Sequence, residues 1–345
     1  NTVRMQCACT ATVSVVRALL ALVAVLQMPG HLGSGDDVRP RDTVSVVTSV
    51  EGGPAARFAV DVVGGDAFLR VRTAGVTAEI PGYDGEPYMR VAADGTVQEN
   101  IASRSSGMNA SRSGLLDPGP AGAAQEWVTV SRDGTVMWHD HRIHWMGASD
   151  PVTVDDNGTV QEWTVQMTVN GESVTVKGVL RLRDRASAAW WLLSVPALVG
   201  AVFLVRGNRR RWYASLCWMS SSVTFVGFLQ WWSMPSGARI TPVLGLFGFA
   251  ALVAANTAAY VARPRPPSVP DRDWVASSVA AGCGVAFIMA AFLVRDQVTS
   301  AWIPMLGPWW LARAAVPVML AAGVVATLDG ATRAVRIEPG SREGD

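Results

Sequence analysis

Three of the four histidines in the chain fall within six residues, in the stretch Met137-Trp138-His139-Asp140-His141-Arg142-Ile143-His144-Trp145-Met146. Imidazole nitrogens are common protein ligands for zinc and copper. If this stretch is a strand, alternate side chains share a face, so His139 and His141 point the same way, with Met137 and Ile143. His-x-His on a strand has a spacing that can clamp one transition-metal ion.

The other residues of the stretch refine this hypothesis. His144 can join the site only if the strand ends or bulges after Arg142. Two histidines with Met137 would suit copper, and three histidines would suit zinc or copper. On the opposite face lie Trp138, Asp140 and Arg142, where Asp140 and Arg142 can form an ion pair.

Two other interpretations of the same stretch remain open. Trp138 and Trp145 bracket a His-Asp-His-Arg run, which is also typical of a buried polar network that fixes a core or its docking onto membrane helices. The stretch, with Met146 at its end, could alternatively form a surface for a partner, namely another envelope membrane protein.

Catalysis and nucleic-acid binding are not expected. The chain contains no Gly-x-Ser-x-Gly elbow, Walker A loop, His-Glu-x-x-His or Rossmann glycine fingerprint. Asp140 could in principle act as an acid or base beside His139 and His141, but the sequence shows no nucleophile to accompany it. The net charge of +1 gives no reason to expect a nucleic-acid partner.

The elements that must position the histidines are short strands. Alternating or β-branched runs at 44–48, 58–62, 68–72, 127–130, 163–169 and 174–182 predict strands, and Asn170-Gly171 predicts a tight hairpin. Asp94-Gly95-Thr96-Val97 recurs at 133–136 and, with Asn first, at 157–160, which indicates repeated turns. Residues 103–124 should form a long loop. The pattern predicts an antiparallel β-sandwich of about seven to nine strands.

The remainder of the chain has the pattern of a membrane protein. An apolar stretch at 12–28, with Arg4 and Arg17 at or before its start, predicts an export signal or anchor. Apolar segments at 188–205, 212–232, 241–262, 274–294 and 309–328 are each long enough to cross a bilayer, and tryptophans mark many of their ends. Arg313 lies near the outer end of the last segment, where we expect it to snorkel towards water, with a functional role as the alternative.

The loop charges orient the chain. Arginines cluster after the first, third and fifth segments, whereas the other loops hold only Arg239 and Arg295. Arginine-rich loops stay in the cytoplasm. The sequence therefore predicts an α+β two-domain, multi-pass protein of a bacterial plasma membrane: a signal or anchor at 1–35, an extracytoplasmic antiparallel β-sandwich at 36–187, a five-helix transmembrane bundle at 188–330, and a cytoplasmic tail at 331–345.

The motif also carries a resemblance. Trp138 to Met146 resembles the Trp-His-Asp-His-Arg-x-His-Trp-Met motif of an uncharacterised family of exported membrane proteins from GC-rich bacteria, and Gly64 to Arg70 looks like the same family. That resemblance implies the architecture but no activity. A looser architectural similarity is to bacterial copper-resistance membrane proteins. The spans here contain no histidine, which departs from that pattern and leaves copper binding outside the membrane as the implication.

Overall fold

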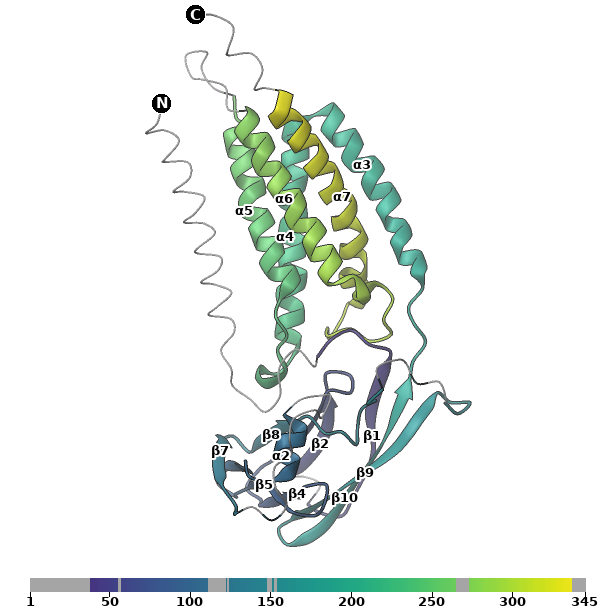
Figure 1. The fold of residues 1–345 in the computed structure, drawn as a ribbon, viewed down its shortest axis with the longest axis vertical. Helices are drawn as coiled ribbons and strands as arrows, with labels where there is room; N and C mark the ends of the chain where they lie inside the picture. Colours follow the sequence, from purple (N-terminus) through teal and green to yellow (C-terminus); the bar gives the residue numbers. More distant parts are fainter. Residues whose placement is uncertain are drawn as a thin grey trace, which may run out of the picture.

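The computed structural model describes residues 38–54, 57–110, 122, 124–147, 151, 154–264 and 273–336. Within these residues ten strands come first along the chain and five long helices follow. Figure 1 shows the strands at one end of the molecule and the helices side by side at the other. We call these parts the β domain and the helical bundle. The predicted export signal and residues 337–345 of the predicted tail lie outside the described residues.

Ten antiparallel strands form two sheets in the β domain. The larger sheet has the order β1-β10-β9-β4-β5-β6-β7 and the smaller one the order β2-β3-β8. The strands are β1 (Thr43–Glu51), β2 (Phe58–Val63), β3 (Phe68–Thr73), β4 (Ala78–Pro81), β5 (Pro87–Val91), β6 (Val97–Asn100), β7 (Trp127–Ser131), β8 (Thr135–Trp138), β9 (Thr159–Val169) and β10 (Glu172–Leu182).

One apolar core collects side chains from both sheets. Along β9, Trp163, Val165 and Met167 are buried and the residues between them are exposed, which is the period of two expected for a strand with one covered face. Leu69 of β3 and Trp138 of β8 belong to the same core. The core therefore joins the larger sheet to the smaller one, and it is β8 of the smaller sheet that leads into the histidine stretch.

The turns follow the sequence prediction. Asn170 and Gly171 both have positive φ, 50° and 81°, and Val169 pairs with Glu172, so β9 and β10 are joined by the expected two-residue turn. The repeated Asp-Gly and Asn-Gly turns are also confirmed, because Gly95, Gly134 and Gly158 all have positive φ. These turns fix the register of the strands they connect.

The predicted loop at 103–124 is wrong at its start. Residues Arg104–Asn109 form a short helix, α2, whose first turn is capped by the Ser103 side chain, which accepts a hydrogen bond from the Ser105 backbone nitrogen. The Glu86 carboxylate also accepts hydrogen bonds from the hydroxyls of Ser103 and Ser105. These contacts stabilise the first turn of α2. Residues 111–121, in the same predicted loop, lie outside the described residues.

Five long helices coincide with the five apolar segments. After a 3-10 turn, η2 (Ala188–Leu193), come α3 (Ser194–Gly207), α4 (Arg209–Ser233), α5 (Val243–Val261), α6 (Asp273–Leu293) and α7 (Trp309–Arg336). Four of the segments are long and apolar enough to cross a membrane: Ala188–Gly207, Val243–Val261, Asp273–Leu293 and Trp309–Ala334. Helix α4 has 25 residues but starts with three arginines and contains several serines, and it is not among the four. The last helix also extends through 331–336, which the sequence had assigned to the tail.

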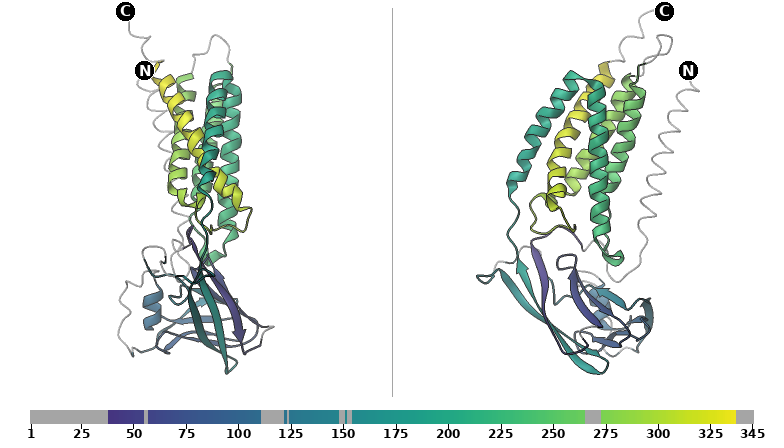
Figure 2. Two further views of the ribbon diagram at one scale, coloured as in Figure 1. Left: turned by 90° about the vertical axis from the view of Figure 1, so that its right-hand side faces the viewer. Right: turned by 180° about the vertical axis from the view of Figure 1, so that it is seen from behind.

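Packing within the bundle is uneven. A Cβ added to Gly227 of α4 would lie 1.9 Å from the backbone nitrogen of Gly245 in α5, and one added to Gly284 of α6 would lie 2.5 Å from the carbonyl oxygen of Gly323 in α7. Such contacts require glycine and bring the helix backbones together. Helix α3 buries only Ala201 among its residues, and Figure 2 shows it at the edge of the bundle.

The β domain is attached to the bundle by backbone and side-chain contacts. Arg41 and Trp302 exchange two backbone hydrogen bonds, with N–O distances of 3.1 and 2.9 Å, and the Ala301 backbone nitrogen donates to Asp42 at 2.8 Å. An apolar cluster spans the same boundary. It contains Val38, Val63, Ala67, Phe68, Met234 and Ala238. The turn between β2 and β3 therefore contacts the loops at one end of the bundle.

Candidate functional site

The histidine stretch begins on a strand but leaves it at once. Strand β8 ends at Trp138, and the chain then turns: the Arg142 backbone nitrogen donates to the Asp140 carboxylate at 3.0 Å and the Ile143 nitrogen donates to the Asp140 carbonyl at 3.1 Å. The prediction that His139 and His141 share a strand face with Ile143 is therefore wrong. Ile143 is instead buried in the main apolar core. The Asp140 side chain accepts a hydrogen bond from a backbone nitrogen that would otherwise pair with a neighbouring strand, so the strand ends.

The turn brings all three histidines together. One ring nitrogen from each of His139, His141 and His144 lies within 4.8 Å of the others, and these three form the group among the described residues that could hold a metal ion. His139 and His144 are 0% and 1% exposed, while His141 is partly exposed. The condition that the sequence set for His144 is met, because the strand ends before it.

The orientation of His139 is set by the backbone of the neighbouring strand. Its Nδ1 lies 2.6 Å from the carbonyl oxygen of Ala67, and a carbonyl can only accept, so Nδ1 carries the hydrogen. In the neutral ring Nε2 then carries the lone pair, and this atom lies 3.2 Å from Nε2 of His144. Metal-binding histidines in proteins commonly donate their second N–H to a carbonyl in this way.

The separation of the nitrogens suits a small metal ion. Zinc–nitrogen bonds of about 2.0–2.1 Å at tetrahedral angles place two ligand nitrogens about 3.3 Å apart. The 3.2 Å between His139 Nε2 and His144 Nε2 matches that spacing. The widest separation among the three ligand atoms is larger, so a shift on the order of 1 Å closes the trio around one ion.

Asp140 supports the cluster and does not contribute a ligand atom to it. Its buried carboxylate accepts from Trp138 Nε1 at 2.9 Å and from two nitrogens of the Arg142 guanidinium at 2.8 and 2.6 Å, so the predicted ion pair is confirmed. Burial alone would raise the pKa of Asp140, but the hydrogen bonds and charge of Arg142 outweigh it and hold the pKa below its usual range. The carboxylate therefore stays ionised and paired.

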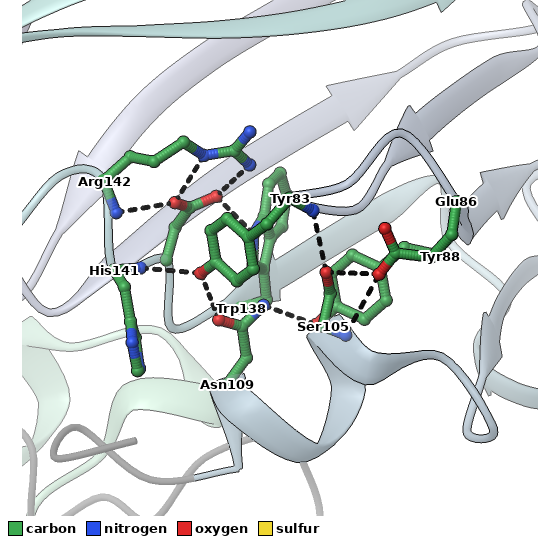
Figure 3. A network of polar contacts seen from close by, with 9 residues as sticks. Tyr83, Glu86, Tyr88, Ser105, Asn109, Trp138, His141 and Arg142 are labelled. Carbon is green, nitrogen blue, oxygen red and sulfur yellow. Dashed lines mark hydrogen bonds and ion pairs between the residues drawn. The ribbon is translucent and has the colours of Figure 1, made fainter. Parts of the chain in front are cut away.

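A tyrosine–asparagine chain extends the network, as Figure 3 shows. The His141 backbone nitrogen donates to the Tyr83 hydroxyl at 2.9 Å, Tyr83 donates to the Asn109 side chain, and Asn109 donates to the Tyr88 hydroxyl at 3.1 Å. Burial raises the pKa of Tyr83 well above its ordinary value, so the hydroxyl stays protonated. The imidazole of His141 points away from these residues, which leaves its ring to the histidine cluster.

Sequence reasoning missed these supporting residues. Tyr83, Tyr88 and Asn109 lie more than twenty residues from the motif, and Ala67 contributes only its backbone carbonyl. None carries a spacing pattern that links it to the histidines. The one usable signal was the Gly64–Arg70 stretch quoted for the family resemblance, which contains Ala67.

The other predicted site residues lie around the cluster. Met137 packs against the apolar cluster between the β domain and the bundle, and it lines a cavity of about 100 Å³ with Pro235 and Gly237. Trp145 packs against the main core of the β domain, and Met146 is exposed. A thioether ligand from Met137 stays a prediction.

Arg313 belongs to a different part of the molecule, the first turns of α7. It is 7% exposed, and it donates to the carbonyls of Gln297 and Val298 at 3.0 Å each and of Ala301 at 3.3 Å. The snorkelling prediction is wrong, because the guanidinium turns into the protein and binds the loop before α7.

Comparison with known proteins returns nothing. No family model matches the chain, and no curated protein and no solved structure is similar to it.

Proposed function

We propose that the chain is a membrane-anchored binding protein that takes a copper or zinc ion outside the membrane through His139, His141 and His144. The observation that carries this proposal is the convergence of the three ring nitrogens within 4.8 Å, with His139 held by a backbone carbonyl. The acidic residue nearest in sequence, Asp140, is already neutralised by Arg142. What remains at the centre is a set of imidazoles, which is the ligand type that zinc and copper prefer.

The proposed location rests on the arrangement of the helices. Helix α4 runs alongside the four apolar helices, so we propose that all five cross the bilayer and that the two sheets form a sandwich outside it. Arg206, Arg210 and Arg333 lie towards the end of the bundle away from the β domain. Arginine-rich ends favour the cytoplasm, which supports a β domain outside the plasma membrane of a bacterium and a cytoplasmic C-terminus. The export signal and the resemblance to exported proteins of GC-rich bacteria are parts of the same proposal.

A specific observation supports the alternative, a structural or assembly module. His139 and His144 already lie within hydrogen-bonding distance of each other, and Asp140 is fully paired. Such a network holds its own geometry without an ion. In this alternative the β domain recognises another envelope membrane protein and the histidines only stabilise the turn.

Metal content of the full chain, purified in detergent and stripped with a chelator, separates the two functions. After loading with Zn²⁺ or Cu²⁺ and desalting, elemental analysis should find about one ion per chain. A cobalt-loaded sample should show the visible bands of a tetrahedral nitrogen site.

The variants make this test specific. His141→Ala removes the partly exposed ligand at the smallest cost in packing and should lower retained metal at least about tenfold, a loss of about 1.4 kcal/mol in binding free energy. Glu172→Ala, which removes an exposed carboxylate of β10 outside the histidine group, is the control and should retain the ion. A wild-type chain that keeps no metal, together with a lower melting temperature in His141→Ala, would establish the structural alternative.

A further inference from the structure

A second site lies at the end of the bundle nearest the β domain. The loop before α7 and the 3-10 turn before α3 line an open cavity of about 470 Å³. It is lined by Trp190, Leu306, Gly307, Pro308, Trp309, Trp310 and Arg313. Three indole rings and one guanidinium around such a volume suit an amphiphile with a negative head.

The charge of Arg313 is the first argument. The Arg313 guanidinium has five N–H donors, and three of them form the hydrogen bonds to backbone carbonyls. Two donors are left for a ligand. Among the described residues, no carboxylate lies within 4.0 Å of its guanidinium nitrogens. The Asp42 carboxylate acts on the Arg313 charge from a longer distance, but it is ion-paired with Arg185. Backbone dipoles therefore make the direct contacts to this buried cation, an arrangement that favours binding of an anion.

The position of the cavity is the second argument. Trp309 and Trp310 begin α7, one of the helices that can cross a membrane, and Trp190 lies in the segment Ala188–Gly207, which is another. Both Trp309 and Trp310 are more than half exposed, and Leu306 is 82% exposed. Indole rings at the ends of spanning helices lie at the level of lipid headgroups. The cavity therefore opens where the phosphates of the bilayer lie.

The direction of α7 is the third argument. Pro308 precedes its first turn, and the positive end of the helix dipole is at the same end as the cavity. Helix N-termini bind phosphate groups through this field. The dipole adds to the charge of Arg313 at the same place.

From these observations we infer that the cavity binds the headgroup phosphate of an anionic phospholipid from the outer leaflet, with Arg313 as the counter-ion and Trp190, Trp309 and Trp310 around the glycerol and upper acyl chains. The charge complementarity and the adjoining apolar helices select a lipid as the occupant. This site is separate from the histidine cluster and does not depend on metal binding.

Lipid retention by the full chain tests the inference. The chain is reconstituted in vesicles of phosphatidylcholine with phosphatidylglycerol, extracted in mild detergent, and analysed for bound lipid by native mass spectrometry. The wild type should retain phosphatidylglycerol in preference to phosphatidylcholine. Equal retention of the two lipids would overturn the inference.

Two variants and one control locate the binding. Leu306→Glu places a carboxylate on an exposed rim residue without disturbing packing, and it should lower phosphatidylglycerol retention by about tenfold, which corresponds to about 1.4 kcal/mol. Arg313→Lys should keep more lipid than Arg313→Gln. Arg239→Gln changes another arginine of the loops beside the β domain, which stacks on Trp231 with its guanidinium carbon 4.1 Å from the ring centroid, and should have no effect.

Two outcomes would assign the cavity differently. A folded Leu306→Glu protein that retains phosphatidylglycerol like the wild type would exclude the cavity as the lipid site. Displacement of the lipid by excess inorganic phosphate would show that the cavity selects a free anion, and the lipid assignment would be wrong.

Discussion

The histidine turn and the end of the helical bundle nearest the β domain both bury charged groups, but the partners of these charges differ. In the turn, the Asp140 carboxylate is held by the Arg142 side chain, so the two charges cancel. Near the start of α7, the Arg313 guanidinium is held directly by three backbone carbonyls and by no carboxylate among the described residues. The first region buries an ion pair and the second buries an ion.

This difference decides what each region can bind. Where the ion pair is closed, the groups left facing one another are imidazoles, whose ring nitrogens suit a metal cation. Where a cation makes its direct contacts only with backbone dipoles, a negatively charged ligand is favoured. Burial by itself therefore says little about a site until the partners of each buried charge are known.

The largest expected effect comes from opening the ion pair. Asp140→Ala leaves the Arg142 guanidinium without its carboxylate and the Trp138 indole N–H without its acceptor. Breaking a buried pair on one side should lower the free energy of unfolding of the β domain by about 3–5 kcal/mol. Tryptophan fluorescence of the full chain in detergent, followed through a urea titration, measures this.

Asp84→Ala is the matched control for that prediction. Asp84 pairs with Arg104 at 2.8 Å, but both side chains are largely exposed. Its loss should change the free energy of unfolding by less than about 1 kcal/mol. Similar shifts in the two variants would show that the Asp140 pair is energetically an ordinary surface pair.

A smaller effect is expected from removing the carbonyl-bound cation. Arg313→Met keeps an apolar chain of similar length but leaves the carbonyls of Gln297, Val298 and Ala301 without this donor. The free energy of unfolding of the bundle should fall by about 2 kcal/mol, and limited proteolysis should cut the loop at 295–301 faster. Arg295→Met, at an exposed position of the same loop, should leave the cutting rate unchanged.

The smallest effect concerns a buried carboxylate that forms no ion pair with the arginines of the described residues. Glu99 is buried in the β domain and accepts a hydrogen bond from Ser106 at 2.7 Å, and burial raises its pKa despite that bond. The folded protein therefore holds the Glu99 proton more tightly than the unfolded chain, whose glutamates titrate at about 4.3. The free energy of unfolding is greatest below that pH and falls as the pH rises through the pKa of the folded state.

Glu99→Gln should therefore flatten the dependence of stability on pH in this window and raise the free energy of unfolding at neutral pH by on the order of 1 kcal/mol. Thermal melts of the full chain between acid and neutral pH provide the measurement. Glu126→Gln, at an exposed position, should reproduce the wild-type pH profile. An identical profile for Glu99→Gln would mean that folding does not raise the pKa of Glu99.

Much of the fold could be predicted from local patterns. The Asn170-Gly171 turn and the Asp-Gly turns need positive φ, which only a few residue types adopt readily, so their sequence determines their structure. Four of the five long helices follow from apolar length, and α4 lies on the fifth predicted segment although it is more polar. The short strands β4, β5 and β6 were missed individually because runs of four or five residues carry little periodic signal.

The site was predicted in its members but not in its geometry. The density of histidines identified His139, His141 and His144, yet the strand periodicity placed His144 outside the pair and Ile143 beside it. A contact two residues along the chain, from the Arg142 backbone to the Asp140 carboxylate, ended the strand. Partners such as Tyr83 and Asn109 come from distant segments and are defined only by the tertiary fold.

The turn between β2 and β3 couples the histidine cluster to the helical bundle. Within three residues, Gly65 lies against the indole of Trp302, where an added Cβ would be 3.1 Å away, and Ala67 holds His139 through its carbonyl. A β domain grafted onto foreign helices would keep its strands but lose the Trp302 indole against which this turn packs. The domain and its membrane loops must therefore be inherited, swapped or engineered together.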